Sequence, residues 1–329
     1  MYGPDHFMYD KEKGRISYFS PATCYKSYLK DHMPVESWHL DKASYHILAD
    51  IPVDVDNYLM ELFWNRYNNT LCVVDQQAFC RDQTSGGSTY YSGFLHLVCL
   101  AMGFRFANKD RQGMRQLALN DSCSVFQREA KYILDREIED PRGLTIIQAM
   151  LVLSDVECAS GRDDLAAMYI GTCCRLAFDF GLNLDCSKLE LSEEIKFRKD
   201  LLCSCIIYDQ AWALYLGRPT NMKISDIASS CLRRRASNVD RPSSEQLSSD
   251  DDLRGQISDA LLELSELNSK IQEIAQPRLT PGTIADENRL IEVAALDMKL
   301  KSWYTALPPR LTWTPENVKQ APRLFFMMQ

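Results

Sequence analysis

The feature that most constrains the fold is a pair of apolar stripes with helical spacing, each followed at once by a glycine. The members of a stripe are three or four residues apart, which places them on one face of a helix. The two glycines, Gly181 and Gly217, can take the left-handed conformation that ends a helix. The spacing therefore predicts two amphipathic helices that each bury one face. Their stripes are Ala166, Ile170, Cys173, Ala177 and Phe180, and Leu201, Cys205, Tyr208, Trp212 and Leu216.

Most of the chain beyond residue 91 has the same helical character. Segments 94–104 and 144–156 are apolar nearly all round, which is typical of a helix surrounded by protein. No strong strand alternation and no fixed-period repeat is apparent. We therefore expect an all-α, multi-helix domain of packed antiparallel helical hairpins with no substantial sheet. Further expected elements are a helix beginning at Asp56 or Asn57, an extended segment over 71–79, and helices over 114–136, 256–275 and 285–306, the last with the stripe Leu290, Val293, Leu296, Leu300 and Trp303.

Composition and charge narrow the class of protein. The 329 residues carry 37 Lys and Arg against 45 Asp and Glu, a formal net charge of −8. Because duplex DNA favours clustered cations, this balance argues against a general nucleic-acid binder. No run approaches the roughly 20 apolar residues that a membrane helix needs. The first residues also lack the basic and apolar regions of a secretory signal, so we expect no membrane association.

The twelve cysteines do not form a metal-binding pattern. Structural zinc sites usually pair two cysteines with two to four residues between them, and no such pair is present. The closest pairs are Cys173-Cys174 and Cys203-Ser204-Cys205. In a chain without a secretory signal, thiols are expected to be reduced and free. We interpret them as small buried hydrophobes and expect no metal or other cofactor in this chain.

The sequence shows no assembled active site. It lacks Gly-x-Ser-x-Gly and a Gly-rich loop before Lys-Ser or Lys-Thr, which would indicate a nucleophile or a phosphate site. Four of the five histidines lie in the first 50 residues, and His96 is expected to be a core imidazole of an apolar helix. Asp155 and Glu157 lie on opposite sides of a helix and do not form a catalytic pair. We predict that the protein is not an enzyme.

Composition also divides the chain. Residues 1–57 mix Tyr, His, Pro and Asp without a sustained period, and we interpret them as a linker-like segment before a domain over 58–329. Residues 233–253 are rich in Ser and Asp, which predicts a mobile loop. Arg233–Arg235 at its start are either an ordinary surface patch or a weak nuclear-import signal. Residues 322–329 have the apolar character of a buried helix that has just begun, so we expect the domain to be truncated at its C-terminus rather than folded back.

Three segments between about residues 59 and 219 carry a resemblance to a known family. The first is Leu62-Phe63-Trp64-x-x-Tyr67, followed by the apolar run from Leu71 to Phe79. The second is Gly171-x-x-x-Arg175-Leu176-Ala177-Phe178-Asp179-Phe180-Gly181-Leu182-Asn183-Leu184-Asp185. The third comprises Arg198-Lys199, Tyr208-Asp209, Leu216-Gly217-Arg218-Pro219 and Ile224-Ser225-Asp226-Ile227. In this order they resemble the regulatory (middle homology) region of the fungal-specific transcription factors, of the xylanolytic-activator and nitrate-regulator type.

The resemblance implies a nuclear domain that regulates transcription by RNA polymerase II in a fungus. It implies partners among other transcription factors or co-regulators, and a small-molecule effector that we would place among the apolar helices at 94–106, 144–156 and 201–216. The alternative is a helical small-molecule-binding or scaffold protein without a direct transcriptional role. Family members bind DNA through six cysteines that hold two zinc ions, whereas residues 1–57 contain one cysteine, Cys24. We therefore expect DNA to be reached only through a missing domain or a partner.

The resemblance also singles out six positions, for which we expect structural roles and keep effector contact as the alternative. Two arginines lie beside helix C-termini, where a cation suits the helix dipole. Two glycines and a proline are expected to end helices. Asp209 lies in an apolar stripe and needs a partner, for which we expect Arg218 or Arg175. The six positions are Arg175, Gly181, Asp209, Gly217, Arg218 and Pro219.

Overall fold

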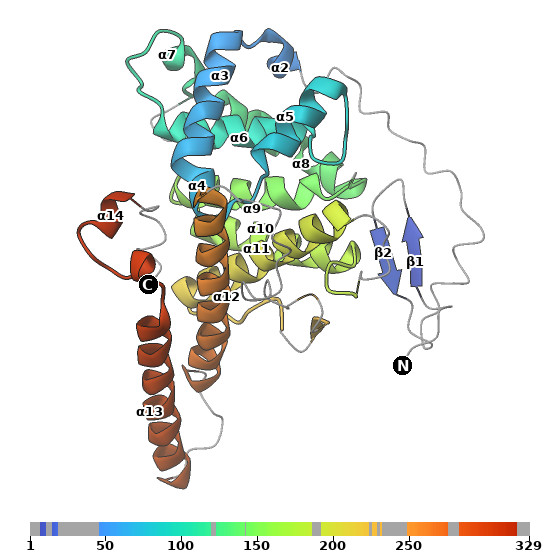
Figure 1. The fold of residues 1–329 in the computed structure, drawn as a ribbon. Coiled ribbons are helices and arrows are strands. Elements are labelled where there is room, and N and C mark those ends of the chain that lie inside the picture. Colours follow the sequence, from blue (N-terminus) through green and yellow to red (C-terminus); the bar gives the residue numbers. More distant parts are fainter. Residues whose placement is uncertain are drawn as a thin grey trace. The chain divides into compact units, whose positions relative to one another are not determined.

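The structure, a computed structural model, is helical in almost all of the chain that it describes (Figure 1). Sheet within that part is limited to a two-stranded antiparallel hairpin, formed by β1 (Phe7–Asp10) and β2 (Arg15–Tyr18). The predicted all-α class is therefore confirmed. The described residues are 7–10, 15–18, 46–119, 123–141, 143–185, 192–223, 226–228, 231, 249–275 and 283–320.

The chain forms two compact units. The first comprises Met1–Asn68 and Val73–Arg198, and the second comprises Asn69–Cys72 and Lys199–Gln329. The first unit holds α2 (His46–Asp50), α3 (Val53–Leu62), the π-helix η3 (Phe63–Tyr67), α5 (Gln76–Ser85), α6 (Gly93–Phe106), α7 (Met114–Leu117), α8 (Val125–Glu139), α9 (Thr145–Cys158) and α10 (Asp163–Asp179). The second holds most of α4 (Asn68–Leu71) and α11 (Ser192–Leu216), with α12 (Ser249–Ala275), α13 (Thr283–Ala306), the short 3-10 helix η6 (Pro309–Leu311) and α14 (Asn317–Gln320).

Helices α6 and α9 form the centre of the first unit. Every residue from Phe94 to Phe104 is buried, and so is nearly every residue of α9. The two helices pack against each other, α6 also packs against α3 and α8, and α9 packs against α8 and α10 (Figure 1). This confirms that segments apolar on nearly all sides are helices surrounded by protein.

The second unit has a smaller apolar core of its own. Its buried residues come from α11, α12 and the segment after α13, and α12 and α13 lie side by side (Figure 1). Four half-buried side chains, one of them from α4, pack around this core. The core residues are Ile207, Ile257, Ala260, Leu261, Leu307 and Leu311, and those around them are Leu71, Leu253, Trp303 and Val318.

Capping groups move three helix boundaries away from the predicted ones. The helix expected at Asp56 or Asn57 begins at Val53, because the Pro52 carbonyl already accepts the amides of Val55 and Asp56. Residues 76–79, expected to be extended, open α5, because the Asp75 carboxylate accepts the Ala78 amide at 2.9 Å. The single helix expected over 114–136 is divided into α7 and α8, with the Ser124 hydroxyl capping the second.

Exposure corrects two further expectations. Leu290 and Val293, assigned to the buried stripe of the 285–306 helix, are exposed, whereas Leu296 of the same stripe is buried. Ten described cysteines are free thiols as predicted, yet Cys72 and Cys80 are exposed rather than buried. None of the described helices combines the length and the apolarity that crossing a lipid bilayer requires.

Two of the predicted segments fall largely outside the described residues. Residues 249–253 of the expected Ser/Asp-rich loop belong to α12. The rest of that loop, residues 233–248 with Arg233–Arg235, lies outside the described residues. The apolar segment 322–329 is also outside the described residues. In the segment 1–57, the described residues form the hairpin, α2 and the start of α3.

Candidate functional site

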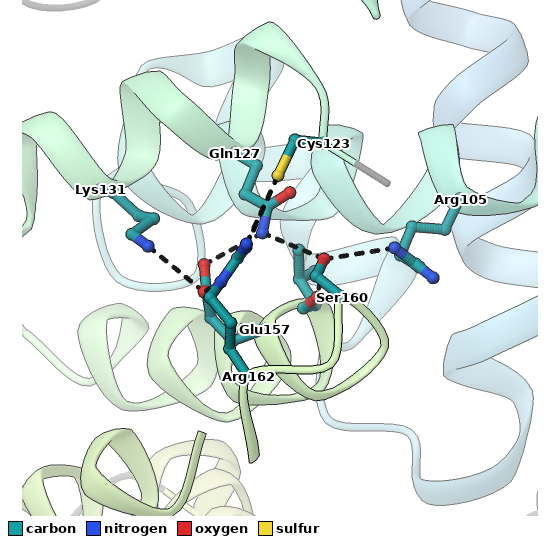
Figure 2. A network of polar contacts seen from close by, with 8 residues as sticks. Arg105, Cys123, Gln127, Lys131, Glu157, Ser160 and Arg162 are labelled. Atoms are coloured by element: carbon teal, nitrogen blue, oxygen red, sulfur yellow. Dashed lines mark hydrogen bonds and ion pairs between the residues drawn. The ribbon is translucent and has the colours of Figure 1, made fainter. Parts of the chain in front are cut away.

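A buried site with several charged groups surrounds the carboxylate of Glu157, near the end of α9 in the first unit. This side chain is 0% exposed. Gln127 Nε2 donates to Oε1 at 3.0 Å, Lys131 Nζ lies 3.3 Å from Oε2, and Arg162 Nε donates to the same Oε2. Gln127 and Lys131 are one turn apart on α8, so α8 presents both to the carboxylate (Figure 2).

The charges around Glu157 decide its ionisation. Burial alone raises the pKa of the carboxyl, but the hydrogen bonds from Arg162 and Gln127 and the charge of Lys131 outweigh burial and hold the pKa below its usual value. The hydrogen bond to Glu157 in turn raises the pKa of Arg162. At neutral pH the carboxylate is thus an ionised acceptor with three donors, which leaves it unsuited to act as a general acid or base.

The same network satisfies the end of α9. Ser160 Oγ donates to the Val156 carbonyl at 2.9 Å and accepts from Arg105 Nη1 at 3.3 Å (Figure 2). Arg105 Nη2 also donates to the Ala159 carbonyl. The two Nη atoms of Arg162 lie 3.7 and 3.6 Å from Cys123 Sγ. Side chains from α6 and α8 therefore hold the carbonyls and the turn that follow α9.

A second polar contact involves His96 on α6. Its imidazole is almost fully buried, with Nε2 2.8 Å from Asp56 Oδ1 and Nδ1 3.2 Å from the Tyr91 hydroxyl. Burial, followed by the nearby charge of Asp56, raises the pKa of Tyr91 to about 12. Tyr91 therefore stays protonated at neutral pH. His96 is thus a buried imidazole of the core, as predicted, and its Nδ1 has a polar partner, whereas the close contact of Nε2 with Asp56 Oδ1 lacks the geometry of a hydrogen bond.

Gly181 lies where three distant segments of the first unit meet. Its φ is +68°, and a Cβ atom built on it would lie 2.1 Å from the Ile16 carbonyl oxygen of β2. The neighbouring Phe180 carbonyl accepts the Ile16 amide at 3.1 Å and Arg198 Nη2 at 2.6 Å. The glycine is thus required both by the left-handed turn after α10 and by the approach of β2.

The structure places Arg175 and Asp209 in different units. Arg175 is largely exposed on α10, with Nη2 3.2 Å from Asp179 Oδ1 one turn ahead. Asp209 is buried on α11 and accepts the backbone amides of Asn221 and Met222, each at 2.8 Å from Oδ2, and Asn221 Nδ2 at 2.7 Å from Oδ1. These donors come from the turn after α11 and were not among the partners expected for Asp209.

The remaining three motif positions form the exposed turn that Asp209 supports. Gly217 has a φ of +64°, and its amide donates to the Leu214 carbonyl at 3.3 Å. The Arg218 amide donates to the Ala213 carbonyl at 2.9 Å, which closes the last turn of α11. Arg218 and Pro219 are exposed. Gly217 therefore lies at the helix end, where the sequence predicted it.

Among the residues that the structure describes, no group of three or more His, Cys, Asp and Glu side chains is arranged to hold a metal ion. The side chains around Glu157 satisfy one another across α8, α9 and the turn that follows α9. Such an arrangement fixes the positions of helices relative to their neighbours within a unit.

The family follows from comparison with known proteins. The model of the fungal specific transcription factor domain matches residues 60–305, most of the chain. The chain belongs to this family. The resemblance stated from the three motif segments is thereby confirmed. The family and the relatives described next are transcription factors and not enzymes, in agreement with the prediction.

Three relatives illustrate the range of similarity within the fungal specific transcription factor family. The nitrogen assimilation transcription factor nirA of Emericella nidulans is 31% identical over 49% of this chain and 19% of its own length. The nitrogen assimilation transcription factor nit-4 of Neurospora crassa is 29% identical over 49% of this chain and 15% of its own length. An uncharacterized transcriptional regulatory protein of Schizosaccharomyces pombe is 25% identical over 81% of this chain and 44% of its own length.

This chain thus matches less than half the length of these curated relatives. No solved structure matches it.

Sequence reasoning missed the charge network because its members are far apart in the chain. Glu157 was considered only as a partner of Asp155, which instead accepts the Tyr67 hydroxyl at 2.8 Å. The four-residue spacing of Gln127 and Lys131 placed two donors on one face of α8, a signal that was available. Nothing in the sequence indicated that this face is directed at α9.

Replacing Glu157 by Gln should lower the free energy of unfolding at pH 7 by about 2–3 kcal/mol, because Arg162 and Lys131 lose their anionic partner. The pKa of the Glu157 carboxyl is lower in the folded chain than its value of about 4.3 in the unfolded chain, so the ionised carboxylate stabilises the fold fully above pH 4.3. This stabilisation is lost as the pH falls through the folded-state pKa, and the difference in free energy of unfolding between wild type and Glu157→Gln should therefore shrink below about pH 4.3. Denaturant unfolding of both proteins at pH 7 and pH 4 measures this difference.

Glu129→Gln serves as the control. Glu129 forms a more exposed pair with Arg128, so its replacement should cost less than about 0.5 kcal/mol. Equal stability of Glu157→Gln and wild type at pH 7 contradicts the assignment.

Replacing Gly181 by Ala should destabilise the first unit more than replacing Gly161 does. Both glycines have positive φ, but a Cβ atom at Gly161 meets nothing within 4 Å. Gly161→Ala thus measures only the cost of placing a residue with a Cβ atom at positive φ, about 1–2 kcal/mol of the free energy of unfolding. Gly181→Ala should cost about 1–3 kcal/mol more, because β2 must move away. Thermal unfolding of the two variants makes the comparison, and equal losses would show that β2 does not approach Gly181.

Proposed function

We propose that this chain is the regulatory, effector-responsive domain of a zinc-cluster-type transcription factor, which acts in the nucleus of a fungus on genes transcribed by RNA polymerase II. The observation that supports it most is the match of the fungal specific transcription factor domain to residues 60–305. The relatives named as nitrogen assimilation transcription factors support the same class.

DNA contact belongs to another domain or to a partner factor in this proposal. The sequence contains no six-cysteine cluster, and its first 57 residues hold Cys24 alone. A net charge of −8 also gives little attraction to phosphate. We therefore propose that zinc is bound outside this chain, which itself needs no cofactor.

Regulation by such a domain requires two states that differ in affinity for an effector or a partner. The partners that fit are other transcription factors or co-regulators, and a small-molecule effector would bind among the apolar helices. We infer structural roles for the six motif positions. Asp209 holds the turn after α11 through three donors, and Gly181 and Gly217 end helices.

A tethering experiment tests the proposed function. Residues 1–329 are fused to a heterologous sequence-specific DNA-binding domain and expressed in a fungal host with a polymerase II reporter that carries its operator. The fusion should enter the nucleus and change reporter transcription relative to the DNA-binding domain alone, because tethering replaces the DNA contact that the chain lacks. Reporter messenger RNA is the measurement.

Two controls make the result decisive. A reporter without the operator should not respond, which excludes indirect effects of expression. The fusion with Gly161→Ala should retain more of the effect than that with Gly181→Ala, if the response needs the folded first unit. A stable nuclear fusion that leaves the reporter unchanged would overturn the proposal in favour of a scaffold or ligand-binding role.

A further inference from the structure

Helix α13 carries large apolar side chains on two opposite faces. One face lies against the second unit, where Leu296 is buried and Trp303 packs against the core. On the other face Leu290, Ile291 and Met298 are 71%, 68% and 71% exposed. Successive residues of an α-helix are turned by about 100°, so Met298 and Leu296, two positions apart, lie on opposite sides. α13 is therefore apolar both where the second unit covers it and on a face that is open to solvent.

The exposed face has small residues at its centre. Ala294 and Ala295 are also exposed, and with Leu290, Ile291 and Met298 they form what is here called the outer face of α13. The intervals of three and four residues from Ile291 to Ala294 and on to Met298 place these side chains along one stripe. An outward helix face is ordinarily polar, and a contiguous exposed apolar patch marks an interaction surface. The alanines let a second helix approach closely between the larger side chains.

Opposite charges flank the centre of the outer face at equal distances. Glu287 precedes Ala294 by seven residues and Lys301 follows it by seven, all within α13. Seven residues are close to two helical turns, so both positions lie on the same side of the helix as Ala294. Lys301 Nζ lies 2.7 Å from Asp297 Oδ2, but both side chains are more than half exposed, and such a pair contributes little. A second helix on the outer face would therefore meet an acidic beginning and a basic end.

We propose that the outer face of α13 binds a second copy of this chain. The two helices run antiparallel about Ala294, related by a twofold axis that makes the two surfaces identical. In this arrangement Leu290 of each copy meets Met298 of the other, and Glu287 lies beside Lys301 of the other. A parallel pair would instead bring like charges together at both ends, which charge complementarity disfavours. The dimer does not depend on the proposed role in transcription.

Sedimentation equilibrium of the full chain, from about 1 to about 100 µM, tests the dimer. Wild type should associate reversibly into a dimer. Ile291→Lys combined with Met298→Lys should raise the dissociation constant at least roughly a hundredfold, because each copy would bury two ammonium groups in the contact. Met298→Lys alone should raise it roughly tenfold, and it replaces the double variant if circular dichroism shows that the double variant is unfolded.

Met168→Lys is the matched control. Met168 lies on α10 in the first unit and is 68% exposed, so its replacement should leave the dissociation constant unchanged. A wild-type chain that stays monomeric at about 100 µM overturns the proposal, since the outer face is then covered from within the chain or by a different protein. A dimer that is as stable with the lysine substitutions as without them overturns it as well.

Charge reversal tests the antiparallel orientation. At low salt, Glu287→Lys and Lys301→Glu should each raise the dissociation constant roughly tenfold, since like charges then face each other at both ends of the contact. The two substitutions together should restore it to near the wild-type value. Charges that served only the dipole of their own helix would give the opposite result, because reversing both ends would destabilise α13 most. A combined variant that dimerises no better than the single ones overturns the antiparallel pairing.

Discussion

The first unit depends on the need to surround two helices that are apolar on nearly every side. α6 and α9 pack against each other, and α3, η3, α8 and α10 pack against one or both of them. Removing a large apolar side chain from water stabilises the folded state by about 1.5–3 kcal/mol, so complete burial of these helices dominates the arrangement. The same burial requires that each polar group on them find a partner within the protein.

Those partners make the arrangement specific. Gln148 binds the Val73 carbonyl, His96 lies between Tyr91 and Asp56, and Glu157 takes donors from α8 and from Arg162. Apolar packing alone tolerates rotation or sliding of one helix along another, whereas a buried carboxylate with three donors is satisfied in one position. The polar residues of the two central helices therefore fix the neighbours that the apolar residues only cover.

The sequence predicted helices and helix ends correctly where residues close together in the chain determine them. The buried nature of segments 94–104 and 144–156 follows from composition alone, and a glycine after an apolar stripe is a reliable sign of a helix end. The prediction of an extended segment over 71–79 was wrong for residues 76–79, because the apolar run was given more weight than the capping carboxylate of Asp75. The exposure of Leu290 shows that periodicity identifies a helix face but not how much of that face a neighbour covers.

Non-local contacts could not be predicted in the same way. No local pattern connects Gly181 with Ile16, or Glu157 with Lys131, because each pair forms only after distant segments pack. The partners of Asp209 were missed for another reason. Charge pairing with an arginine was the only kind of partner considered, although backbone amides of a nearby turn are also good donors to a buried carboxylate and require no second charge to be desolvated.

These features explain how motif residues can mark a family that has no reaction centre. The Phe180 carbonyl beside Gly181 joins β2, α10 and Arg198, and the carboxylate of Asp209 joins α11 to its following turn. A domain that acts through binding rather than chemistry needs residues that keep its helices in defined positions, since a shift between two such positions is what an effector or partner can select. Substitution at these junctions should therefore change the positions of the segments that they join.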